Sequence, residues 1–148
     1  MLGPHEVVPL RARQTHDLRR RVLRDGKADA VVEFEGDDAP RSFHLGLVAG
    51  EGRELVGVAS FLDVPFQGRP AFQLRGMAVD PSCQGRGFGA RLLEAGVASA
   101  RARGAEVVWA KGRDAVLGFY QRQGWQVVGD GFVYGPMDLP HHLVVREL

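Results

Sequence analysis

A glycine-rich stretch between a strand and a helix is the feature that most restricts how this chain can fold. Phe72–Val79 has the composition of a buried strand, and the glycine-rich stretch Gly85–Ala90 follows after a proline turn. Apolar residues at helical spacing then predict a helix over Gly87–Arg103, and Glu106–Ala110 is a short apolar strand. Two strands joined through a helix pair in parallel with a right-handed crossover. The chain is therefore predicted to contain a sheet with at least one parallel strand pair.

The remaining predicted elements surround this unit in one domain over residues 1–148, a length typical of a single core. The link Gly50–Arg53 is short enough to join its two flanking strands as a hairpin. The other elements are a strand at Glu6–Leu10, a helix at Thr15–Arg24 capped by Thr15, the hairpin strands Phe43–Ala49 and Glu54–Leu62, a helix at Asp114–Gln123 capped by Asp114, and strands at Trp125–Val128 and Leu143–Arg146. The expected fold is α/β of the α+β type, a mixed sheet with helices on its faces.

The glycine-rich stretch also predicts a binding site for an anion. The first N–H groups of a helix have no partner within the helix and lie at the positive end of its dipole. Gly85, Gly87 and Gly89 allow a ligand to approach the backbone closely, and Arg86 adds a charged donor. The sequence therefore predicts that a phosphate-bearing ligand binds at Gly85–Ala90.

Two other phosphate-binding motifs fit this stretch less well. Gly85–Ala90 also matches the dinucleotide fingerprint G-x-G-x-x-G/A, but Asp80–Gln84 separates it from its strand. The chain also lacks the series of strand–helix units that a doubly wound dinucleotide domain needs. A P-loop is excluded because no Lys-Ser/Thr pair follows the glycines.

The same segment resembles a loop of a known enzyme superfamily. Gln84-x-x-Gly87-x-Gly89 is similar to the Q/R-x-x-G-x-G/A pyrophosphate loop of the GNAT superfamily of N-acetyltransferases. Met77–Pro81 resembles the strand and turn before that loop, and Phe119–Trp125 resembles the second signature, F-Y-x-x-x-G-F. The resemblance covers Phe72–Val128. It implies a GNAT-like sheet that is mostly antiparallel, with a splayed central parallel strand pair and helices on both faces.

The resemblance implies that acetyl-CoA is the acyl donor and indicates where it binds. In this family the backbone of the strand that contains Met77 and Val79 pairs with the pantetheine arm, and the loop N–H groups hold the pyrophosphate. The residues implied to contact acetyl-CoA are Met77, Ala78, Val79, Gln84, Gly85, Arg86, Gly87, Phe88, Gly89, Ala90 and Lys111. Lys111 stands near a place where many relatives carry an asparagine, so that contact departs from the family pattern.

The resemblance further implies transfer of an acetyl group to a primary amine of a small molecule or peptide, by direct attack of the amine on the thioester. Tyr120 corresponds to the tyrosine that often protonates the departing CoA thiolate, and a phenol is a proton donor at neutral pH. A base must remove the ammonium proton. His141 is the first candidate because the last strand borders the cleft in this family, and the alternatives are His142, Glu33, Glu35 and Asp63.

Other interpretations of these residues remain open. Tyr120 can instead be a packing residue, and Cys83 can be a nucleophile, although no base stands near it in sequence. His141 and His142 face opposite ways on a strand, so no metal site is predicted. The chain can also be an acyl-CoA-binding or sensing module without catalysis, or an acyltransferase for a longer acyl chain.

Composition excludes several other classes of protein. The net charge is +1, which is not the basic excess of a nucleic-acid module, and Arg19–Arg21 is interpreted as a solvated helix face. No apolar run reaches the roughly 18 residues of a membrane span. The single cysteine cannot form an intrachain disulfide, so the cytoplasm is the expected location. The expected partners are therefore acetyl-CoA and an amine, and a homodimer stays open.

Overall fold

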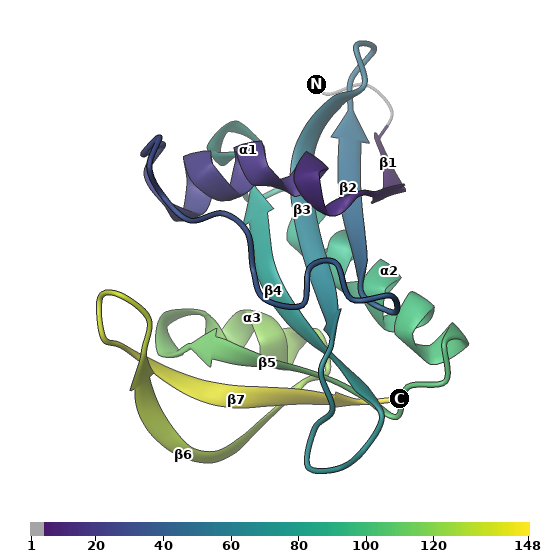
Figure 1. The fold of residues 1–148 in the computed structure, drawn as a ribbon, viewed down its shortest axis with the longest axis vertical. Coiled ribbons are helices and arrows are strands. Elements are labelled where there is room, and N and C mark those ends of the chain that lie inside the picture. Colours follow the sequence, from purple (N-terminus) through teal and green to yellow (C-terminus); the bar gives the residue numbers. More distant parts are fainter. Residues whose placement is uncertain (1–4) are drawn as a thin grey trace.

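Seven strands form one sheet in the computed structural model, which describes residues 5–148 (Figure 1). The strands are β1 His5–Leu10, β2 Phe43–Ala49, β3 Glu54–Asp63, β4 Ala71–Val79, β5 Val107–Arg113, β6 Gln126–Tyr134 and β7 Leu139–Glu147. Their order across the sheet is β1-β2-β3-β4-β5-β7-β6, and every neighbouring pair is antiparallel except β4 and β5. The predicted mixed, mostly antiparallel sheet with a central parallel pair is confirmed.

Helices cover both faces of the sheet, as predicted. On one face, α2 (Phe88–Ala102) and α3 (Leu117–Arg122) lie over the core, and Leu92, Leu93 and Val97 are buried beneath α2. Gly96 of α2 lies so close to β3 that a Cβ there would be 1.9 Å from the Phe61 ring. On the other face a helical segment consists of a 3-10 turn (Ala12–Thr15), α1 (His16–Leu18) and a π turn (Arg19–Leu23). Leu18 of α1 packs on Val58 and Ala78.

Both predicted helix caps are wrong. The helical segment begins at Ala12, and the buried Thr15 lies inside it, where its hydroxyl donates to Ala12 O at 2.6 Å. Asp114 does not cap the following helix, because its carboxylate accepts a hydrogen bond from His142 Nδ1 at 2.7 Å. In each case the side-chain oxygen that would have capped the helix makes a hydrogen bond to another group instead.

The two C-terminal strands are longer than predicted. The expected strand Trp125–Val128 becomes β6, which continues to Tyr134, and the expected Leu143–Arg146 becomes β7, which begins at Leu139. The interruption at Gly129–Gly131 is a break in pairing register rather than the end of the strand, because pairing with β7 resumes at Phe132. Glycine and aspartate are poor strand formers, and a bulge tolerates them where an ideal strand would not.

A bulge in β4 opens the middle of the sheet. The register between β3 and β4 shifts between Val58 and Ser60, and Gly76 in the bulge has a φ of +64°. Beyond the first three residue pairs, Ala71 to Gln73 against Val107 to Trp109, β4 and β5 are no longer paired, and Figure 1 shows them diverging. Residues 74–79 of β4 therefore have an open edge in the centre of the sheet, as the splayed pair predicted.

A buried ion pair holds the long loop before β2 against the sheet. Arg19 was expected on a solvated helix face, but its side chain is 1% exposed, so that interpretation is wrong for this residue. Its guanidinium donates to both carboxylate oxygens of Asp37, at 2.7 and 2.9 Å, and also to Val32 O and Ser60 Oγ. The backbone N–H of Phe34 also donates to Asp37. These bonds compensate the desolvation of two buried charges.

His44 completes this buried network. Its Nε2 lies 2.9 Å from the carbonyl of Asp37, which can only accept, so Nε2 carries the proton. Burial alone would raise the pKa of Asp37, but the hydrogen bonds from Arg19 and Phe34 and the charge of Arg19 outweigh it, and the pKa lies below its ordinary value. The carboxylate is therefore charged at neutral pH.

Removing the charge of Asp37 should destabilise the whole domain. Asp37→Asn leaves the Arg19 guanidinium buried and unpaired, so the free energy of unfolding should fall by about 3 to 5 kcal/mol in a urea titration. Asp17→Asn is the matched control, because Asp17 pairs with Arg21 at the surface and should change stability by no more than about 0.5 kcal/mol. Equal effects of the two substitutions would contradict the role given to the buried pair.

The same pair should make stability depend on pH in acid. Folding lowers the pKa of Asp37, so its contribution is complete above the ordinary pKa of an aspartate and is lost as the pH falls through the lowered pKa of the folded state. The stability of the wild type should therefore decrease over that range more steeply than that of Asp37→Asn. Parallel curves for the two proteins would show that other carboxylates dominate.

Candidate active site

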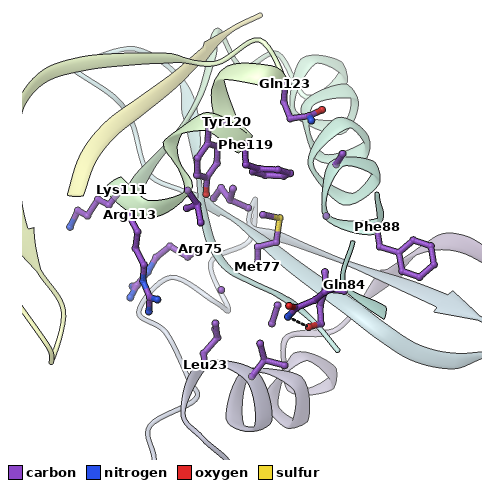
Figure 2. Close-up of a pocket in the computed structure, with 18 of the residues that line it drawn as sticks. Leu23, Arg75, Met77, Gln84, Phe88, Lys111, Arg113, Phe119, Tyr120 and Gln123 are labelled. Carbon is purple, nitrogen blue, oxygen red and sulfur yellow. Dashed lines mark hydrogen bonds between the residues drawn. The ribbon is translucent and has the colours of Figure 1, made fainter. Parts of the chain in front are cut away.

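The open edge of β4 lines one cleft of about 1170 Å³, which runs between β4 and β5 (Figure 2). The residues that line it extend from the N-terminal end of α2 to Lys111 and Arg113 of β5 and His141 of β7. The predicted site residues that line it are Met77, Ala78, Val79, Gln84, Gly85, Gly87, Phe88, Gly89, Ala90, Lys111, Tyr120 and His141. Arg86 is exposed and does not line the cleft. The structure thus brings predicted site residues as far apart in sequence as Met77 and His141, 64 positions, to the walls of one cleft.

The glycine-rich loop presents a cradle of backbone N–H groups at one end of the cleft. Gly85 and Gly87 have φ of +80° and +79°, and nothing lies within 4 Å of the position that a Cβ would take at either residue. The first hydrogen bond of α2 is donated by Arg91 to Gly87 O at 3.1 Å. The N–H groups of residues 88–90 come before this bond and have no partner within the helix. Left-handed glycines followed by a helix N-terminus form a concave site that suits an anion.

Gln84 and Asp80 fix the turn between β4 and this cradle. Gln84 Nε2 donates to Val79 O at 3.0 Å, shown dashed in Figure 2. The side-chain hydrogen bond from Ser82, followed by that from Arg21, keeps the pKa of Asp80 below its ordinary range. The charged carboxylate therefore caps the turn at Ser82 N. Gln84 thus lines the cleft while its side-chain amide is bound to the protein backbone.

The backbone of β4 offers hydrogen-bonding groups to the cleft. Asp80 N–H donates to Val56 O, toward β3, and successive residues of a strand point to opposite edges. The N–H groups of Met77 and Val79 therefore point toward the open edge that β5 has left. An extended ligand with amide groups can pair with them as an additional strand would.

Tyr120 lies at the middle of the cleft with its hydroxyl directed into it (Figure 2). Its ring packs against Phe119 and Trp125 and is buried. Burial raises the pKa of the phenol to about 12. Tyr120 is therefore neutral, and a hydrogen-bond donor, throughout the physiological range.

The two C-terminal histidines point to opposite sides, as predicted. His142 makes its hydrogen bond to Asp114 and does not line the cleft. His141 does line the cleft, stacked near Phe132 and edge-on to Tyr134. Its Nδ1 lies 2.7 Å from Leu139 O and must donate to it, so Nε2 of the neutral ring is left as the proton acceptor.

The three acidic alternatives for the base lie outside the cleft. Glu33, Glu35 and Asp63 are exposed and do not line it, and the identity of the base stays a prediction. Cys83 does line the cleft, but it is 3% exposed and its side chain belongs to the main core. Among residues 5–148 there is no group of three side chains that could hold a metal ion, and no helix long and apolar enough to span a membrane.

Three cationic residues line the far half of the cleft, and the sequence pointed to only one of them. Lys111 Nζ lies 4.1 Å from the Tyr134 ring centroid, and Arg75 lies over Phe34 at 4.3 Å. Arg113 is exposed at the end of β5. Arg75 and Arg113 were missed because single arginines in strands carry no motif. The strand predicted at Glu106–Ala110 is also longer in the structure, where β5 continues to Arg113.

The chain is similar in sequence to known proteins. A family model described as "Acetyltransferase (GNAT) family" matches residues 11–125. YitI of Bacillus subtilis, described as an uncharacterized N-acetyltransferase, is 30% identical over 151 residues, covering 96% of this chain and 95% of its own.

Solved structures share the fold at low sequence identity. An aminoglycoside 6'-N-acetyltransferase complexed with coenzyme A superimposes with a TM-score of 0.74 at 17% identity, covering 96% of both chains. FeeM, an N-acyl amino acid synthase from uncultured soil microbes, superimposes with a TM-score of 0.76 at 18% identity, covering 97% of this chain and 91% of its own.

A side chain at Gly87 should weaken anion binding at the cradle. Gly87→Val puts two methyl groups where nothing now lies and strains a φ of +79°, so affinity for CoA, measured by calorimetry, should fall at least about tenfold. Gly104→Val is the matched control, because Gly104 has a φ of +84° and equally open surroundings at the far end of α2. If the two variants bind CoA equally well, the loop is only structural.

Proposed function

Because the chain belongs to the GNAT acetyltransferase family, we propose that it transfers an acetyl group from acetyl-CoA to a primary amine by direct attack on the thioester. The observation that carries the proposal is the open edge of β4, which leads directly into the cradle of N–H groups at Gly85–Ala90. A long ligand that carries amides at one end and a pyrophosphate at the other fits this sequence of donors. Acetyl-CoA is such a ligand.

The residues of the cleft supply three functions in the proposed reaction. The N–H groups of Met77 and Val79 hold the donor arm, and an N–H of β4 polarises the thioester carbonyl. Nε2 of His141 accepts the proton that the ammonium must lose before it attacks. The amine nitrogen then forms a bond to the acyl carbon as the carbon–sulfur bond breaks, and the sulfur leaves as a thiolate.

Tyr120 acts on the departing thiolate. An ordinary thiol has a pKa near 8.5, well below the value of about 12 for the buried phenol, so complete proton transfer from Tyr120 is uphill. A hydrogen bond from the phenol to the developing negative charge carries no such penalty. We therefore assign Tyr120 as a hydrogen-bond donor in the transition state that keeps its own proton. The new amide nitrogen loses its second proton to solvent, and the thiolate takes its final proton from solvent as it departs.

The fold by itself does not choose the acceptor. Two neighbours with the same fold have names that refer to an aminoglycoside and to an amino acid. The second name also describes an acyl rather than an acetyl group, so acyl-chain length belongs in the test. A series of acyl-CoA donors of increasing length, assayed with one amine, separates an acetyltransferase from an enzyme for longer chains.

Acetyl-CoA should stabilise the protein, and an amine should release CoA from it. At about 100 times its dissociation constant, acetyl-CoA should add roughly 2.7 kcal/mol to the free energy of unfolding, while NADPH should add nothing. Release of free CoA from acetyl-CoA should then depend on an added amine. Stabilisation without release in any amine would show a binding module, and a response only to NADPH would show a dinucleotide site.

Replacing Tyr120 should slow the chemical step without weakening binding. Tyr120→Phe removes one oxygen and little volume, and we expect kcat to fall by about 10- to 100-fold with the KM for acetyl-CoA nearly unchanged. A packing role predicts the reverse, a lower Tm with kcat preserved. If kcat stays within about twofold, Tyr120 is not the donor to the leaving group.

A further inference from the structure

We infer that the acceptor carries a carboxylate beside its reactive amine, and that Arg75, Lys111 and Arg113 bind this carboxylate. The inference rests on the proposed function and identifies the class of substrate for it. All three cations line the half of the cleft opposite the glycine cradle. Figure 2 shows their side chains on one side of the cleft, away from Phe88 and Gln123.

These cations have no carboxylate partner, in contrast to four arginines of this chain that are ion-paired. Arg19, Arg21, Arg53 and Arg69 each form an ion pair with an aspartate or glutamate. Within residues 5–148, no carboxylate lies within ion-pair distance of Arg75, Lys111 or Arg113. Like charges gathered in a cleft repel one another, so this arrangement favours binding of an anion from outside.

Two of the cations are held in place by aromatic rings instead. Lys111 lies over Tyr134 and Arg75 over Phe34, and contact with the face of a ring uses none of the N–H donors of the cation. The donors therefore stay available to a ligand. Phe34 is itself fixed, because its N–H donates to Asp37 and Arg19 also lies over its ring, at 3.9 Å. The buried network thus positions Arg75 indirectly.

The phosphates of CoA are not the expected anion here. Lys111 and Arg113 pair across the sheet with Leu143 and His141, which gives these residues one face of β5 and β7. Gly112 and Val144 have the other face, where they pack against Tyr120 of α3. The glycine cradle opens beside α3, because Gly89 lies near Phe119. The sheet therefore separates the three cations from the predicted pyrophosphate site, and the inference assigns Lys111 to the acceptor instead of to the acetyl-CoA contact that the family resemblance implies.

The same charges disfavour acceptors that are polycations. The charged residues that line the cleft are Arg24, Asp25, Arg75, Lys111 and Arg113, so positive charge exceeds negative charge. A polyamine or an aminoglycoside would bring several more positive charges into this space. An amino acid or a short peptide instead brings one amine toward His141 and one carboxylate toward the cations.

The first experiment compares acceptors that differ only at the carboxylate. CoA release is measured with a panel of L-amino acids, the carboxamide of each, ethanolamine phosphate and spermidine. We expect kcat/KM for the best amino acid to exceed that of its carboxamide by at least about tenfold, the effect of a charge-assisted hydrogen bond, and to decrease with added salt. The amine of a carboxamide loses its proton more easily, so reactivity alone would favour the carboxamide.

The second experiment couples the acceptor to the cation. In Arg113→Gln, KM for the amino acid should rise about tenfold, KM for its carboxamide should not change, and calorimetry should give the wild-type Kd for acetyl-CoA. Arg101→Gln is the matched control, since Arg101 is exposed on α2 and does not line the cleft. It should leave both KM values as they are.

Each contrary result has a separate meaning. Equal losses for the amino acid and its carboxamide, or a loss of acetyl-CoA affinity, would overturn the assignment of Arg113 to the acceptor carboxylate. A preference for ethanolamine phosphate would replace the carboxylate with a phosphate, and a preference for carboxamides or spermidine would reject an anionic acceptor. Binding of acetyl-CoA with no CoA release for any amine would instead overturn the proposed function, and the inference with it.

Discussion

The interrupted hydrogen-bond ladder between β4 and β5 is the constraint on which the rest of this structure depends. Backbone N–H and C=O groups inside a sheet need partners, and β5 supplies them to β4 over only three residue pairs. The remaining edge of β4 faces a cleft in the middle of the molecule. Such an edge suits a ligand that can pair with a strand, and the glycine cradle at its end suits an anion.

Two structural features keep that edge open. The bulge at Gly76 changes which residues of β4 face α2, so Leu74 packs toward the core before it and Met77 after it. Only glycine fits at position 76, because a Cβ there would lie 2.6 Å from the Phe34 ring. The Arg19–Asp37 pair holds Phe34 in that position. The Phe34 ring therefore contacts both the buried network of Arg19 and Asp37 and the residues that line the cleft.

The two halves of the cleft attract anions by different physical means. At the cradle the attraction comes from backbone dipoles, which are fixed by the fold and need no charged side chain. At the far half it comes from side-chain charges on β4 and β5, which can change without disturbing the fold. The proposed donor site therefore depends on the backbone, and the proposed acceptor site depends on side chains.

The sequence by itself determined the order of elements and the parallel strand pair, because these depend on local signals such as apolar periodicity and closely spaced glycines. That the pair is splayed came only from the resemblance of Gln84–Gly89 and Phe119–Trp125 to a known family. It placed Tyr120 and His141 among the candidates through motif and position, and both line the cleft. The ends of β6 and β7 and the two helix caps were mispredicted, because bulges and tertiary partners override local preference. Only the tertiary structure buried Arg19, excluded Glu33, Glu35 and Asp63 from the cleft, and brought Arg75 beside Lys111 and Arg113. Those outcomes depend on which strands become neighbours, and contacts between residues distant in sequence leave no periodic signal in the chain.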